Sequence, residues 1–213
     1  QDNYNDRLNL SGLWAVNQNL RVGPYMSLDS TVFDDDTKND FVTYEPGIVA
    51  TYRPTGLYTV EGSLGYNIID VDVDNNPNAD AEDNMWTAGV AVRGPITKYM
   101  THSLQASYER SAGLRTVDVN YSEEVWFNYG IDLIVRKNVN AYSTVAFGAI
   151  NESDAGINSE NADVFQGAVG VNYSPGAATS LGLEYEYTNK YSDIDDNDYD
   201  QSRINLTFNY NFF

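Results

Sequence analysis

Large apolar and small polar side chains alternate along most of this chain, and this alternation limits what the chain can fold into. In "TVEGSLGYNII", for example, Val60 and Leu64 fall on one side of an extended backbone and Glu61 falls on the other. The final segment, "RINLTFNYNFF", repeats the pattern. Successive side chains of a strand point to opposite faces, so a period of two predicts β-strands with one apolar face and one polar face.

Eleven segments of the chain show this pattern, and no helical period competes with it. They lie near residues 6–16, 20–32, 42–53, 57–73, 85–94, 101–111, 123–136, 139–151, 163–173, 179–191 and 201–212. We therefore predict an all-β antiparallel protein with about eleven or twelve strands in one domain spanning residues 1–213.

The connections between these segments alternate between short and long without exception. The short ones lie near residues 17–19, 54–56, 95–100, 136–138 and 174–178, and the long acidic ones near 33–41, 70–84, 112–122, 151–162 and 191–200. Strands of about ten residues with this alternation are typical of bacterial transmembrane β-barrels, which have short periplasmic turns and long extracellular loops. A soluble sandwich or lipocalin-like barrel also alternates strand faces, so it remains the alternative at this point.

Three features favour a membrane barrel, in which apolar rows face lipid and polar rows face the interior. The polar faces carry mostly small uncharged side chains, and the charges gather in the long loops. Aromatic residues fall near strand ends, as interfacial girdles do in membrane proteins. Examples are Trp14, Tyr44, Tyr52, Trp86, Tyr173 and Tyr187. We predict a bacterial outer-membrane location with membrane lipid as a partner.

Composition excludes several classes of function. Cysteine is absent, so thiolate metal sites and cysteine nucleophiles are excluded, and a single histidine, His102, leaves no multi-histidine metal site. The position of His102 in its segment places it on the apolar face, which indicates an interfacial anchor rather than a catalytic base. The net charge of -19 argues against nucleic acid as a partner. We predict no catalytic residues, no metal site and no enzymatic activity.

The end of the chain resembles the signal by which the barrel-assembly machinery recognises outer-membrane proteins. Phe208, Tyr210 and Phe212 share one face of the last segment, and Phe213 adds one aromatic residue, which departs by one position from the commonest form. The resemblance implies that the assembly machinery is a partner of this chain and that these four residues form its assembly signal.

About half of the chain, from Thr101 onward, is similar to the β-barrel porins found beside bacterial exopolysaccharide and capsule genes. The matching features are "THSLQASYERS" and "SLGLEYEYTNKYSDIDDNDYDQSRINLTFNYNF", including Tyr185, Tyr187, Ser192 and the "DYD" before the last segment. The resemblance implies a barrel fold in the outer membrane with the C-terminus in the periplasm, and polysaccharide as cargo.

An odd number of strands creates a counting problem, because bacterial single-chain barrels have even strand numbers. With the C-terminus in the periplasm, eleven strands place Gln1 on the extracellular side. We therefore expect the chain to be the C-terminal part of a larger barrel, unless a hairpin within "LNLSGLWAVNQNLRVGPYMSL" is miscounted.

Charged residues on the polar faces are the candidates for lining a hydrated lumen. They are Arg21, Glu61, Arg93, Glu109, Asp132, Glu184, Glu186 and Arg203. Such charges could filter solutes, or could pair with one another and stabilise the wall. Both interpretations remain open for each residue.

The acidic loop "DVDVDNNPNADAED" supplies oxygen ligands of the kind that calcium binds. Asp70, Asp72 and Asp74 suit the first positions of a calcium loop, but Asn75 replaces the turn glycine and Ala81 occupies the twelfth position. A solvated acidic loop is the better interpretation, and Ca²⁺ is the only cofactor that the sequence suggests.

These patterns predict a porin-like outer-membrane barrel that passes, or supports the export of, hydrophilic solutes, and the resemblance implies polysaccharide as the cargo. A structural barrel that binds a protein partner is the alternative.

Overall fold

The computed structural model describes residues 3–33, 41–71, 82–112, 121–153, 160–176, 178–194 and 197–210. These residues form one antiparallel sheet. Its strands are β1 (Asn3–Ser11), β2 (Trp14–Ala15), β3 (Leu20–Phe33), β4 (Phe41–Tyr52), β5 (Thr59–Val71), β6 (Glu82–Thr97), β7 (Met100–Ala112), β8 (Tyr121–Arg136), β9 (Val139–Ser153), β10 (Glu160–Tyr173), β11 (Thr179–Ser192) and β12 (Tyr199–Tyr210).

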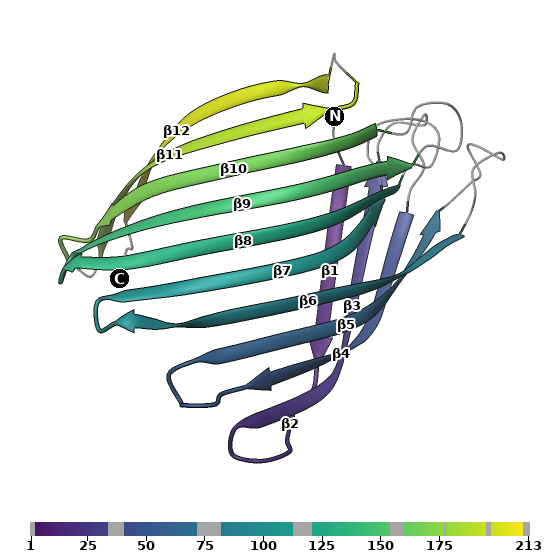
Figure 1. Cartoon of the computed structure of the whole chain (residues 1–213), viewed down its shortest axis with the longest axis horizontal. Coiled ribbons are helices and arrows are strands. Elements are labelled where there is room, and N and C mark those ends of the chain that lie inside the picture. The colour runs from purple at the N-terminus through teal and green to yellow at the C-terminus, as the bar shows by residue number, and fades with distance from the viewer. Residues whose placement is uncertain are drawn as a thin grey trace.

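From β3 to β12 the strands follow one another through the sheet in chain order and each pairs with its sequence neighbours, while β1 and β2 both pair with β3 (Figure 1). The sheet is strongly curved, but it does not close on itself, since β1 and β12 do not pair. The all-β antiparallel prediction is confirmed. Among the described residues, no helix is long and apolar enough to cross a membrane.

β1 and β2 form one interrupted strand beside β3. Ser11 pairs with Tyr25 and Trp14 pairs with Val22, so the register is the same on both sides of the interruption. At the interruption the carbonyl oxygen of Gly12 points at Gly23. A Cβ added to Gly23 would lie only 1.7 Å from that oxygen. Glycine is therefore required at position 23. Because β1 and β2 share one place beside β3, the twelve strands fill eleven places across the sheet, one for each of the eleven predicted segments.

The short connections are tight hairpin turns at one end of the sheet. In the β2–β3 turn, the Asn17 side chain accepts hydrogen bonds from the backbone N–H groups of Asn19 and Leu20. β6 and β7 are joined through Lys98 and Tyr99 alone, and β8 and β9 through Lys137 and Asn138. The long connections leave from the opposite end (Figure 1), and much of their length lies outside the described residues.

Candidate functional site: the polar face of the sheet

The two faces of the sheet have an inverted distribution of polarity compared with a soluble protein. Thr87 and Asn67 are each only 5% exposed, whereas Leu206 is 79% exposed and Ile204 is 73% exposed. Most of the exposed large apolar side chains occupy the same face, on alternate residues of each strand. Among the described residues, four apolar side chains are buried, Ile69, Ala146, Ala162 and Val164, and the register places all four on the polar face. The apolar side chains therefore do not meet in a dry core.

The pairing register places all eight predicted lumen-lining residues on the polar face. They are Arg21, Glu61, Arg93, Glu109, Asp132, Glu184, Glu186 and Arg203. Within this set the structure brings Glu186 and Arg203 together, with 4.0 Å between the carboxylate and the guanidinium. Asn205 donates from its side-chain nitrogen to both Glu184 and Glu186, at 3.1 and 3.2 Å.

The remaining predicted residues are spread across the face. Arg21 and Glu61 are separated by Thr51, which pairs with both of them. Glu109 pairs directly with Glu124 of the next strand, so two carboxylates occupy opposed positions on the polar face. Carboxylates of neighbouring strands therefore meet at this point of the polar face.

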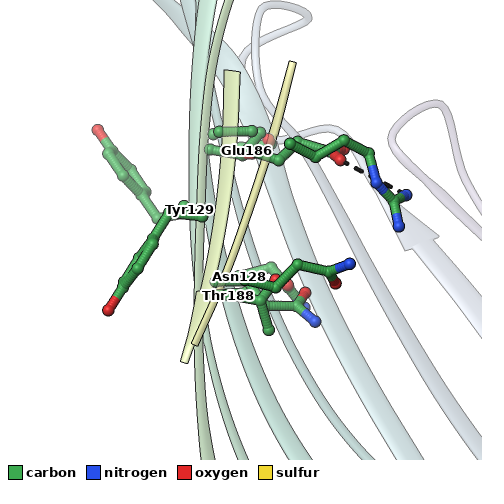
Figure 2. Close-up of a pocket in the computed structure, with 14 residues that line it drawn as sticks. Asn128, Tyr129, Glu186 and Thr188 are labelled. Atoms are coloured by element: carbon green, nitrogen blue, oxygen red, sulfur yellow. Dashed lines mark ion pairs between the residues drawn. The ribbon is translucent and has the colours of Figure 1, made fainter. Parts of the chain in front are cut away.

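A hollow of about 470 Å³ lies on the polar face over strands β7 to β12. Small residues, including Gly130, Ala146 and Ala168, leave the space, and the longer side chains of Asn128 and Gln166 border it. Figure 2 shows Asn128, Thr188 and Glu186 on one side of the wall and Tyr129 on the opposite side. The side that bears Glu186 is the one toward which the N-terminal strands curve.

The chemistry of the hollow comes from two adjacent rows of the sheet. One row runs through Asn128, Ala146, Gln166, Thr188 and Gln201, and the other through Gly130, Thr144, Ala168, Glu186 and Arg203. Amide and hydroxyl groups both donate and accept hydrogen bonds. The hollow therefore offers mixed hydrogen bonding to a polar solute, with one acid–base pair at its β11–β12 side.

Three aromatic side chains lie flat on the polar face because glycines beneath them provide the space. The side chain of Tyr25 lies across Gly47 and Gly65. A Cβ at Gly47 would come within 2.4 Å of the ring, and a Cβ at Gly65 within 2.3 Å of the hydroxyl oxygen, which donates to Glu45. Glu45 also accepts a hydrogen bond from Thr87 at 2.9 Å. This arrangement connects β3 with β6 across the interior surface.

The other two aromatic residues repeat the arrangement on later strands. Trp126 lies over Gly148 and donates from its indole nitrogen to Glu124 at 2.7 Å. Tyr142 lies over Gly170 and donates to Glu184 of β11. Sequence analysis missed all three contacts, because the only signal is a glycine at a position that the register later places beside an aromatic residue.

The loop between β11 and β12 is held from both faces of β10. On the polar face the buried Glu160 pairs with the buried Lys190 and accepts hydrogen bonds from Ser192 and Asn197, at 2.7 and 2.8 Å. On the other face Asn161 donates to Asp193 from both its backbone and its side chain. These hydrogen bonds lower the pKa of Asp193. One end of β10 therefore fixes the described part of this loop.

The apolar face carries clusters of aromatic rings. His102 lies on this face, with ring centroids 6.0 Å from Tyr58 and 6.1 Å from Tyr129. Phe147 and Phe165 pack with their centroids 5.1 Å apart in the middle of the sheet. The aromatic residues named from the sequence lie on this face by register, namely Trp14, Tyr44, Tyr52, Trp86, Tyr173 and Tyr187.

Two of the four residues of the predicted assembly signal can be placed. Phe208 and Tyr210 lie on the apolar face of β12 and are 64% and 50% exposed. Phe212 and Phe213 lie outside the described residues. Residues 72–81, most of the acidic loop considered above as a calcium site, also lie outside them. The part of the chain that the structure describes has no group of three or more acidic or histidine side chains placed to hold a metal ion.

The decisive comparison is with a family model. The model of the outer membrane protein beta-barrel domain matches residues 49–212, which is most of the chain. The chain belongs to this family. Its sheet is the wall of an outer-membrane barrel, and its location is the bacterial outer membrane.

Solved structures with the same fold are outer-membrane channels and transporters. The outer-membrane channel DcaP of Acinetobacter baumannii aligns over 96% of this chain and 62% of its own, with a TM-score of 0.68 and 16% identity. The copper transporter OprC aligns over 97% of this chain and 41% of its own, with a TM-score of 0.66 and 12% identity. The FrpB iron transporter from Neisseria meningitidis aligns over 89% of this chain and 36% of its own, with a TM-score of 0.63 and 9% identity.

At these identities the likeness concerns the fold alone. The chain spans about three fifths or less of the length of these three structures. A search of curated protein sequences finds no match.

Proposed function

We propose that this protein is part of an outer-membrane channel that passes hydrophilic solutes along its polar face. The supporting observation is the inverted polarity of the sheet, with Leu206 and Ile204 exposed on one face and Thr87 and Asn67 buried on the other. In a bilayer the exposed apolar face contacts hydrocarbon, and the polar face then lines an enclosed aqueous space. Passage through such a space needs no reaction centre and no cofactor.

We propose polysaccharide, or another chain of hydroxylated units, as the solute. The hollow over β7 to β12 presents amide and hydroxyl groups such as Asn128, Gln166 and Thr188. Groups that donate and accept are suited to the hydroxyls of a neutral sugar. The resemblance of residues 101–213 to porins beside exopolysaccharide genes suggests the same cargo.

Conductance through the purified barrel in planar lipid bilayers tests this proposal. We expect discrete current steps, and we expect neutral oligosaccharides to reduce the current while they occupy the lumen. Folded protein that inserts without producing current would contradict conduction and would favour the alternative, a structural barrel that binds a protein partner. Current that is insensitive to oligosaccharides would contradict the proposed cargo alone.

A further inference from the structure

Two adjoining hollows lie on the apolar face of the sheet, over strands β7 to β11. Their volumes are about 480 and 470 Å³, and they share four lining residues, Val125, Ala149, Asp163 and Tyr191. They are on the side of the wall that bears Tyr129 in Figure 2, opposite the hollow of the polar face. In an outer-membrane barrel this side is toward lipid. Because they share these residues, the two hollows form one groove on the lipid side, which we call the outer groove.

The outer groove exists because one row of the sheet is low in its middle. The pairing register aligns five residues of neighbouring strands in this row, Tyr108, Val125, Ala149, Asp163 and Tyr191. The two tyrosines stand at the ends of the row, and the small side chain of Ala149 lies at its centre. The row therefore has an aromatic residue on each side and a low floor between them, where a lipid chain can lie.

Polarity changes along the outer groove from the middle of the sheet to the long-loop end. The row on the middle side is aromatic and contains Phe127, Phe147 and Phe165. The row on the loop side is polar and contains Glu123, Asn151, Asn161 and Asp193. Along β10 the two rows are about 13 Å apart, since each residue of a strand advances about 3.3 Å. An acyl chain on the aromatic row would place its headgroup near the polar row.

The charges of the outer groove are acidic. The carboxylate of Glu123 lies 3.9 Å from the guanidinium of Arg110, whose side chain is only 8% exposed, so this cation is not presented to a ligand. Asp193 accepts two hydrogen bonds from Asn161. Among the described residues, Asp163 has neither a hydrogen bond nor an ion pair, although it is exposed on the lipid side. A carboxylate at the edge of hydrocarbon is stabilised by a cation beside it, and a lipid headgroup can supply that cation.

We propose that the outer groove binds one membrane lipid whose headgroup carries an ammonium group. The acyl chain lies against Phe147 and Phe165, and the ammonium lies beside Asp163 at the long-loop end. Contact between the rest of the apolar face and lipid is nonselective, whereas this site selects a headgroup, because the carboxylate attracts an ammonium and repels a bare phosphate. The site depends on which face meets lipid and does not depend on conduction.

Native mass spectrometry of the full-length protein tests the headgroup. The protein is mixed in detergent with equal amounts of phosphatidylethanolamine, phosphatidylglycerol and lipid A. We expect one retained phosphatidylethanolamine per barrel. Asp163→Asn should lower the excess of phosphatidylethanolamine over phosphatidylglycerol by about fivefold, as expected for the loss of one surface charge pair. Asp132→Asn makes the same change of charge on the polar face and should leave this ratio unchanged.

Ala149→Trp tests the groove itself, because the larger side chain fills its floor. Tryptophan is favoured where proteins meet the membrane interface, so the variant should still fold and keep its heat-modifiable mobility on gels. It should lose the retained lipid, whereas Leu104→Trp, on the same face outside the groove, should keep it. Absence of a retained lipid, equal or greater retention of phosphatidylglycerol or lipid A, or retention that survives Ala149→Trp would overturn the proposal. An unchanged lipid preference in Asp163→Asn would also overturn it, and this variant decides alone if Ala149→Trp does not fold.

Discussion

At the scale of single residues, glycines determine how aromatic side chains lie on the polar face. Tyr25, Trp126 and Tyr142 would project into the interior if their neighbours had side chains. Instead each ring lies against the wall and its polar atom is held by a glutamate. Because the three rings lie flat against the sheet, they take up little of the space in front of the polar face.

Gly47→Ala should destabilise the folded barrel by about 1 to 3 kcal/mol, because the new methyl group overpacks the wall. Its Cβ would lie 2.4 Å from the ring of Tyr25 and 2.6 Å from the backbone oxygen of Leu64. The matched control is Gly62→Ala, whose Cβ would have its nearest neighbour at 3.9 Å. Urea unfolding in lipid vesicles measures both, and equal stabilities of the two variants would contradict the role assigned to Gly47.

If the barrel conducts as proposed, Glu186→Gln should lower the ratio of cation to anion permeability by roughly a factor of two. A contact between charges is worth about 1 kcal/mol in water and is further screened by salt. Arg203 lies 4.0 Å from Glu186, so Arg203→Gln should shift the preference in the opposite direction. Reversal potentials in a salt gradient report both shifts. Unchanged potentials in both variants would show that this pair only stabilises the wall.

At the scale of strands and loops, the ends of β10 and β11 combine a buried ion pair with a loop anchor. Glu160 and Lys190 are 3% and 6% exposed, and Glu160 also binds Ser192 and Asn197. Removing one member of a buried ion pair leaves an unpaired charge and lowers the stability strongly, whereas replacing both members by apolar residues is often tolerated. Glu160 and Lys190 should therefore be harder to replace singly than together.

Glu160→Ala should cost about 3 to 5 kcal/mol and should expose the β11–β12 loop to protease, because Lys190 stays buried without its carboxylate. The double variant Glu160→Leu with Lys190→Met should recover most of the stability. It should not restore protease resistance, because the hydrogen bonds from Ser192 and Asn197 are still missing. Equal losses of stability in the single and double variants would contradict this account.

Much of the strand order could be predicted from the sequence, because alternation and connection length are local properties. The eleven predicted segments correspond to the eleven places along the observed sheet, with β1 and β2 sharing one. The interruption at Gly12 could not be predicted, since it depends on how closely Gly23 approaches from the next strand.

The candidate site was only partly predictable. The alternation of polar and apolar residues identifies Glu186 and Arg203 as residues of the polar face, but only the pairing register of β11 with β12 shows that the two lie side by side. The contact of Tyr142 with Gly170 and Glu184 spans three strands and depends on two registers. A single sequence contains no direct record of such pairings.

At the scale of the whole molecule, the placement of apolar side chains on the outer face determines where the protein can be stable. Phe127 and Asn128 are adjacent in the middle of β8 and lie on opposite faces, and Phe127 is 54% exposed. In water such an aromatic patch would favour association, whereas in a bilayer it is solvated by hydrocarbon.

Phe127→Arg should destabilise the barrel in lipid vesicles by about 2 to 4 kcal/mol, because it places a charge in hydrocarbon. Asn128→Arg places the same charge in the hollow of the polar face and should change the stability little. The difference between these neighbouring variants measures the polarity on each side of the wall, and a larger loss for Asn128→Arg would reverse the assignment of the two faces.

The most direct test of the inverted polarity is a scan of single cysteines along β8, each carrying a nitroxide spin label, in lipid bilayers. The native chain has no cysteine, so each label reports one position. We predict that Val125, Phe127, Tyr129 and Ile131 are accessible to oxygen dissolved in the lipid, and that Asn128 and Gly130 are accessible to a water-soluble nickel chelate. The opposite assignment, or equal accessibility to the chelate on both faces, would contradict the proposed membrane barrel.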